Sequence, residues 1–79
     1  MKREKIMLRT INDVKAFVNA VTKYSFEVDL LSGRYAVDAK SIMGIFSLDL
    51  SKEIVMEVHS EECPELTDFL NDIKPFIVK

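Results

Sequence analysis

The stretch Thr22–Gly44, "TKYSFEVDLLSGRYAVDAKSIMG", decides the fold. Apolar residues occupy alternate positions on both sides of its centre: Phe26, Val28 and Leu30 before it, Tyr35 and Val37 after it. Alternation of this kind is typical of strands that bury one face. Residues 31–34 lie between the two runs and include Gly33, which suits a turn that needs a positive φ angle. The stretch therefore predicts a β-hairpin, and a short helix follows it from Ser41.

The residues before the hairpin predict a strand and then a helix. In the segment Lys5–Arg9, Ile6 and Leu8 lie on one side, as in a short strand. Asn12-Asp13 then offers a helix N-cap. The helix that follows has an apolar stripe at the i, i+3, i+4, i+7 spacing, formed by Val14, Phe17, Val18 and Val21.

The residues after the hairpin predict two helices with a strand between them. The short helix that Ser41 opens is expected to end at Asp49–Lys52. The strand has apolar residues at alternate positions, namely Ile54, Met56 and Val58. Pro64 suits the first turn of the last helix. Acidic residues that suit its positive end are Glu61, Glu62 and Glu65, and its apolar stripe is Leu66, Phe69, Leu70 and Ile73.

Pro75 is expected to stop this helix near Lys74, because proline lacks a backbone donor and clashes with the preceding turn. The apolar tail Phe76–Val78 is expected to pack as an extended segment. The predicted order is β-α-β-β-α-β-α in one domain, residues 1–79. Since every strand has one apolar face and each long helix one apolar stripe, we expect an α+β fold. A four-stranded antiparallel sheet would carry three helices on one face and leave the other face open to water.

Composition excludes several classes of function. The net charge of −2, with both signs interspersed, argues against a nucleic-acid binder. No apolar run reaches membrane-spanning length, and the start "MKREKIML" is too short for a signal peptide, so we expect a cytoplasmic protein. One cysteine and one histidine argue against a disulfide framework and a structural zinc site, and only two glycines argue against a phosphate-binding loop. We therefore expect no metal and no cofactor.

The segment Lys40–Lys52, "KSIMGIFSLDLSK", resembles the central part of HPr, the small phosphocarrier of the bacterial sugar phosphotransferase system. The resemblance continues without a gap through the hairpin and covers residues 14–59, with a looser match over the last helix. It implies the open-faced β-sandwich of HPr, which is the fold that the periodicity predicts.

One departure from the family bears on function. HPr proteins carry phosphate on a histidine at the start of the first helix, in a Gly-apolar-His-Ala-Arg-Pro context, whereas this chain has "LRTINDVKAF" there. Counting back from the helix puts Thr10 at the position of the histidine and Asn12 at that of the arginine. Because a threonine hydroxyl is a poor nucleophile without a base, we expect a degenerate, non-catalytic protein that is not an enzyme and has a regulatory, protein-binding role.

The resemblance also suggests where a partner would bind. Ser41 matches the serine that a dedicated kinase phosphorylates in the Firmicute branch of the family, and it also suits a plain N-cap. Ile42, Met43 and Phe46 match the apolar docking surface of the second helix of HPr. Two neighbouring apolar residues, Ile45 and Leu48, are expected to face the core instead. Partners would be phosphotransferase-system or regulatory proteins, and we expect a monomer.

Three alternatives remain open. The chain could be a phosphocarrier with a non-standard acceptor, either His59 or Thr10, although His59 reads more simply as a solvated position at a strand end. Cys63 lies before Pro64 at a helix start, where a thiol can be reactive, but a small residue near a cap is the simpler interpretation. A small-molecule regulatory domain is the third alternative, although no cluster of convergent polar residues supports it.

Overall fold

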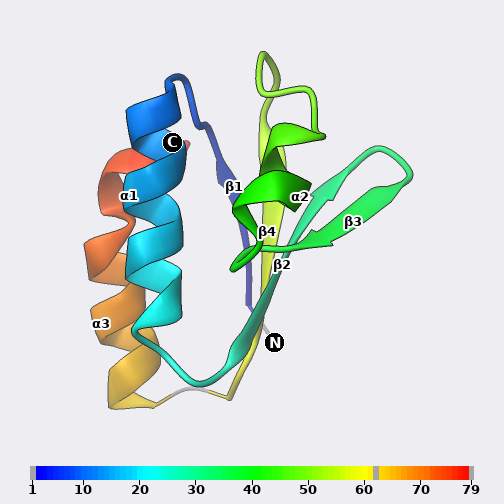
Figure 1. Ribbon diagram of the computed structural model, residues 1–79. Coiled ribbons are helices and arrows are strands. Elements are labelled where there is room, and N and C mark those ends of the chain that lie inside the picture. The colour runs from blue at the N-terminus through cyan, green and yellow to red at the C-terminus, as the bar shows by residue number, and fades with distance from the viewer. Residues whose placement is uncertain (1, 62, 79) are drawn as a thin grey trace.

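The computed structural model describes residues 2–61 and 63–78 and contains a four-stranded antiparallel sheet in the order β1-β4-β2-β3 (Figure 1). The strands are β1 Lys2–Ile6, β2 Glu27–Ser32, β3 Tyr35–Asp38 and β4 Ile54–His59. β2 and β3 form the predicted hairpin. Gly33 begins the turn between them with a φ angle of 60°, as a two-residue turn with glycine first requires.

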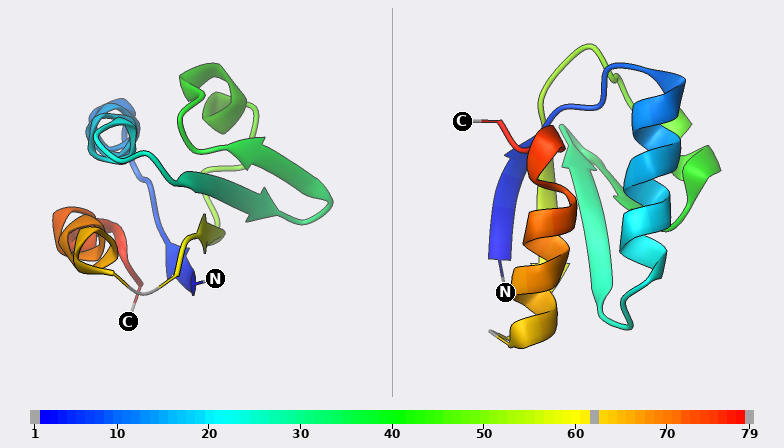
Figure 2. Two further views of the ribbon diagram at one scale, coloured as in Figure 1. Left: turned by 90° about the horizontal axis from the view of Figure 1, so that it is seen from below. Right: turned by 90° about the vertical axis from the view of Figure 1, so that its left-hand side faces the viewer.

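Three α-helices cover one face of this sheet (Figures 1 and 2). They are α1 Ile11–Thr22, α2 Ile42–Phe46 and α3 Pro64–Asp72, and the short 3₁₀ helix η1, Lys74–Phe76, follows α3. α1 and α3 lie side by side, and α2 lies on the other side of α1 over the hairpin (Figure 2). Within residues 2–61 and 63–78, no helix covers the other face of the sheet (Figure 2). This arrangement confirms the predicted α+β fold.

The core lies between the sheet and the helices. β4 is a central strand, and its residues Ile54, Met56 and Val58 are fully buried at alternate positions. The apolar stripes of the long helices pack onto them, as the periodicity predicted. The fully buried core residues are Ile6, Leu8, Val14, Phe17, Val21, Val28, Leu30, Ala39, Ile45, Ile54, Met56, Val58, Phe69 and Ile73.

The prediction for the chain start was wrong in its boundaries. β1 ends at Ile6, because beyond it the Met7 N–H donates a 2.8 Å hydrogen bond to the carbonyl of Phe76 and the chain leaves β4. The helix N-cap is Thr10 rather than Asn12-Asp13, and its Oγ1 accepts a 3.0 Å bond from the N–H of Asp13. Asp13 therefore lies inside the first turn.

The short helix also ends earlier than predicted. α2 stops at Phe46, and the chain from Asp49 to Lys52 belongs to the following turn. The side-chain hydroxyl and backbone N–H of Ser51 both donate to the Asp49 carboxylate, and these bonds lower the pKa of Asp49. Such local bonds compete with continued helix, which explains why the helix does not extend this far.

The predicted extended tail Phe76–Val78 is extended only from Ile77, because Phe76 is the last residue of η1, and from Ile77 the chain packs against β1. Ile77 forms an isolated antiparallel bridge with Ile6, and the Val78 N–H donates a 2.8 Å bond to the carbonyl of Lys5. The Phe76 ring meets the Phe17 ring edge-on at 6.1 Å. This tail therefore covers one side of the core.

Two observations complete the description. Glu62, predicted near the positive end of α3, lies outside the described residues. Across residues 2–61 and 63–78, no helix has both the length and the apolar character needed to span a bilayer.

Candidate functional site

The candidate docking surface on α2 consists of Ile42, Met43 and Phe46. Met43 is 78% exposed and Phe46 is 42% exposed, and the two side chains lie three residues apart on the same side of the helix. Ile42 departs from the prediction, because it is half-buried and packs against the core. Ile45 and Leu48 are buried, as expected. The exposed apolar part of α2 is therefore Met43 and Phe46.

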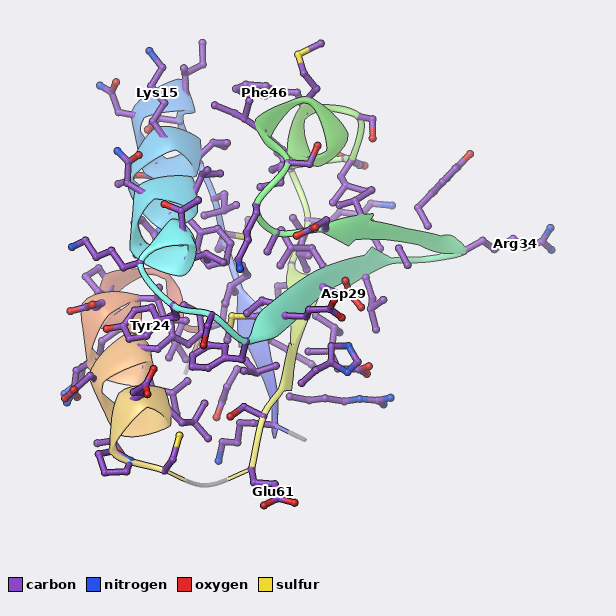
Figure 3. All side chains as sticks on the ribbon, turned by 60° about the horizontal axis from the view of Figure 1, so that its bottom comes forward. Lys15, Tyr24, Asp29, Arg34, Phe46 and Glu61 are labelled. Atoms are coloured by element: carbon purple, nitrogen blue, oxygen red, sulfur yellow. The ribbon has the colours of Figure 1, made fainter. Side chains whose placement is uncertain are left out.

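α1 lies next to α2. The two helices pack against each other (Figure 1). Figure 3 shows Phe46 and Lys15 on the same side of the molecule, while Asp29 lies on the opposite side of the sheet. Ile11, the first residue of α1, is 63% exposed. The sequence analysis did not identify Ile11 as an exposed apolar residue. It placed the N-cap at Asn12-Asp13, and the structure shows that Ile11 is the first helical residue after the true cap, Thr10.

Ser41 is the N-cap of α2. Its exposed Oγ accepts a 3.2 Å hydrogen bond from the N–H of Gly44. A Cβ atom at Gly44 would lie 3.2 Å from that Oγ and 3.3 Å from the Cβ of Val37, so glycine leaves room for both. The neighbouring Lys40 extends its ammonium group away from Ser41 and donates a 3.1 Å bond to the carbonyl of Tyr24. Ser41 thus has a structural role that also leaves its hydroxyl accessible.

Thr10 is engaged in helix capping. Its hydroxyl oxygen accepts a hydrogen bond from the backbone N–H of Asp13. The side-chain carboxylate of Asp13 in turn accepts a 3.0 Å bond from the backbone N–H of Arg9. This reciprocal pair is a variant of the capping box. The Thr10 hydroxyl and the Asp13 carboxylate are thus both used in capping the start of α1.

His59 lies in a charge network on the open face of the sheet. Its Nε2 atom is 2.9 Å from Oδ2 of Asp29 and 3.3 Å from Oε1 of Glu57, and Arg3 donates a 2.7 Å bond to the other oxygen of Glu57. The prediction of a plainly solvated position was wrong, because the strand register brings carboxylates to His59 that are distant in sequence. α1 lies over the opposite face of the sheet from Asp29 (Figure 3), and Thr10 is the N-cap of that helix, so the two alternative acceptors do not form one site.

Cys63 is the N-cap of α3 and is half-buried. Its side chain makes no capping hydrogen bond, and its Sγ lies 3.9 Å from Oγ of Ser60. With Lys2 and Leu66 it lines a shallow open groove. Over the described part of the chain, every buried side-chain nitrogen and oxygen atom has a hydrogen-bond partner.

Comparison with known proteins agrees with this geometry. The family described as PTS HPr component phosphorylation site matches residues 12–77. HPr-C-His from Thermoanaerobacter tengcongensis has a TM-score of 0.75 and 22% identity over 95% of this chain and 89% of that chain. HPr from Bacillus anthracis has a TM-score of 0.69 and 17% identity over 98% and 96%. No curated protein matches the chain.

A regulatory relative has the same fold. The Bacillus subtilis catabolite repression protein Crh has a TM-score of 0.64 and 22% identity over 94% of this chain and 88% of that chain, and its structure is a domain-swapped, intertwined dimer. At these identities the likeness shows the fold, whereas the family match rests on the sequence itself and spans most of the 79 residues. The chain therefore belongs to the HPr family of the phosphotransferase system.

Proposed function

We propose that this protein is a non-catalytic member of the HPr family that acts by binding a protein partner through α2. The observation that carries the proposal is the exposed pair Met43 and Phe46 on a helix whose other apolar residues are a buried Ile45 and a half-buried Ile42. A domain this small gains nothing from exposing two large apolar side chains beside each other, and such patches commonly mark interaction sites. Methionine also adapts to varied partner surfaces.

Phosphoryl relay through the histidine chemistry of the family is not part of this proposal. His59 is the one histidine of the chain, and Thr10 is the residue that we align with the family's histidine. Relay needs a nucleophile that forms a labile phosphoryl bond near neutral pH, which imidazole provides and an unassisted hydroxyl does not. The hydroxyl of Thr10 already caps α1.

Ser41 would regulate the contact. A phosphate on its exposed hydroxyl would add about −1.5 to −2 charges immediately before the docking residues. That charge would weaken binding to an apolar or acidic partner surface, and it would strengthen binding to a surface that offers arginine. Phosphotransferase-system and regulatory proteins are the expected partners, and family membership leads us to expect a cytoplasmic protein.

Intact mass after two incubations tests the proposal. The first contains phosphoenolpyruvate and Enzyme I of the phosphotransferase system, and the second contains ATP and the serine kinase of the family. We expect no phosphate in the first incubation. We expect one phosphate in the second, lost in Ser41→Ala and retained in Ser47→Ala, since Ser47 is an exposed serine at the other end of α2. An acid-labile phosphate after the first incubation, lost in His59→Gln, would instead establish a phosphocarrier with an unusual acceptor.

Partner capture tests the docking surface separately. Met43→Glu and Phe46→Glu should abolish retention of the partner. Tyr35→Glu serves as a matched control, because Tyr35 is also large, apolar and exposed but lies in β3 beside the hairpin turn. Retention lost equally in all three variants would contradict a docking site on α2. Sedimentation across a concentration series would test the expected monomer against a swapped dimer like that of Crh.

A further inference from the structure

The open face of the sheet brings three metal-ligating side chains together. Asp29 of β2 lies directly opposite Glu57 of β4, and His59 follows two positions along β4 on the same face. The nearest nitrogen or oxygen atoms of the three side chains all lie within 4.8 Å of one another. Two carboxylates directly opposite each other in adjacent strands repel, and Arg3 offsets this repulsion from only one side, at Oε2 of Glu57. One imidazole N–H can offer only one proton to the two facing oxygens.

We propose that Asp29, Glu57 and His59 form a binding site for Zn²⁺. Zinc binds nitrogen and oxygen ligands at about 2.0–2.2 Å in a tetrahedron, which puts the ligand atoms roughly 3.4 Å apart. The Nε2 atom of His59 lies 2.9 Å from Asp29 Oδ2 and 3.3 Å from Glu57 Oε1, close to that spacing. A small movement of two side-chain termini would therefore admit the ion.

Arg3 orients one of the three proposed ligands, Glu57. Its Nε donates a 2.7 Å bond to Oε2 of Glu57, which leaves Oε1 directed at His59. The Glu57 side chain is only 12% exposed, so this bond holds a largely buried carboxylate in one orientation. Partners of this kind, bonded to the second atom of a ligand, orient metal ligands in known sites. Arg3 is here a positioning residue and makes no contact with the ion.

The ligand set favours zinc over harder cations. Imidazole is a preferred ligand of Zn²⁺, whereas Ca²⁺ takes six to eight oxygen ligands and Mg²⁺ prefers oxygen in octahedral geometry. Asp29 and His59 are 41% and 32% exposed, so the fourth position would face solvent and accept water or a side chain of a second molecule. The sequence argued against a structural site of four cysteine or histidine ligands and led us to expect no metal, so this proposal departs from that expectation. The sequence pattern gave no sign of this site, because Asp29 and Glu57 meet through strand pairing.

Calorimetric titration of the tag-free, full-length protein with ZnCl₂ tests the proposal. We expect saturable binding of one ion per chain, a raised melting temperature, and a shift of the His59 ring nitrogen signals in NMR spectra. His59→Gln and Asp29→Asn should each weaken binding at least tenfold. Glu53→Gln is the matched control, because it removes an exposed carboxylate just before β4 and outside the cluster, and its affinity should change less than twofold.

Several outcomes would overturn the inference. Absence of saturable binding would do so, as would binding that persists in both His59→Gln and Asp29→Asn. Binding that disappears in Cys63→Ser would assign the ion to the thiol instead. Asp29→Asn is nearly isosteric and Asp29 is partly exposed, so circular dichroism of this variant separates lost binding from lost folding. Failure of this site would leave the proposed docking surface on α2 untouched, because that surface lies on the opposite side of the molecule (Figure 3).

Discussion

The hydroxyl of Tyr24 donates a 2.6 Å hydrogen bond to the Asp72 carboxylate, and this bond joins the segment after α1 to the last residue of α3. The Tyr24 ring also lies 5.4 Å from the rings of both Phe26 and Phe69, stacked on the first and edge-on to the second. The aromatic cluster and the hydrogen bond therefore link the C-terminal end of α1 to the last turn of α3.

The first prediction concerns the pH dependence of this link. The hydrogen bond to Asp72, followed by burial, raises the pKa of Tyr24 from 10.0 to about 12. Because the folded-state pKa is raised, the stabilising contribution is complete below pH 10 and is lost as the pH rises toward about 12. The chain has two tyrosines, so tyrosinate absorbance in Tyr35→Phe reports Tyr24 alone.

Asp72→Ala in the same background should bring the tyrosinate midpoint back toward the ordinary pKa of tyrosine. Loss of stability between pH 10 and 12 should be smaller in Tyr24→Phe than in the parent. A parent midpoint already near 10 would show that the Asp72 bond does not persist in solution.

The second prediction separates core from surface on α2. Ile45 is fully buried and Met43 is 78% exposed, although both lie in the same five-residue helix. Ile45→Val should lower the free energy of unfolding by ~0.5–1.5 kcal/mol, because it removes a buried methyl group and leaves a small cavity. Met43→Ala should change it by less than ~0.5 kcal/mol. Urea denaturation measures both, and equal losses would mean that Met43 is buried in solution.

The third prediction tests which residue caps α1. Thr10→Ala should cost ~0.5–2 kcal/mol, because the N–H of Asp13 loses its acceptor. Asn12→Ala should be close to neutral, because Asn12 is exposed inside the first turn. Chemical denaturation of the two variants side by side provides the measurement. If Asn12→Ala lowered the free energy of unfolding more than Thr10→Ala did, Asn12 would be the N-cap instead.

The fourth prediction concerns the start of α3, where Cys63 is the N-cap and makes no capping bond with its side chain. Serine is among the preferred N-cap residues, and its hydroxyl would accept from a free N–H in the first turn. Cys63→Ser should therefore raise the free energy of unfolding by ~0.5–1 kcal/mol. Thermal and urea denaturation would reveal the gain, while a net loss would mean that the apolar packing of the thiol outweighs the cap.

Most of the candidate docking surface could be predicted from sequence. The burial of Ile45 and Leu48 and the exposure of Met43 and Phe46 agree with the expectation. Ile42 does not, because it is half-buried and packs against the core. Helical spacing tells which residues share a side of a helix, but in a helix of five residues the rotation relative to the sheet depends on the packing.

By itself, the sequence determined the kind and order of the elements, because hydrophobic periodicity and the turn at Gly33 act over a few neighbouring residues. Only the tertiary structure decided where β1 leaves the sheet. The N–H of Met7 bonds to the carbonyl of Phe76, a residue near the other end of the sequence. The tertiary structure also decided the partners of His59, because strand register between β2 and β4 places Asp29 beside it. Local patterns specify which face a side chain takes, whereas contacts across the chain depend on how all the strands pair at once.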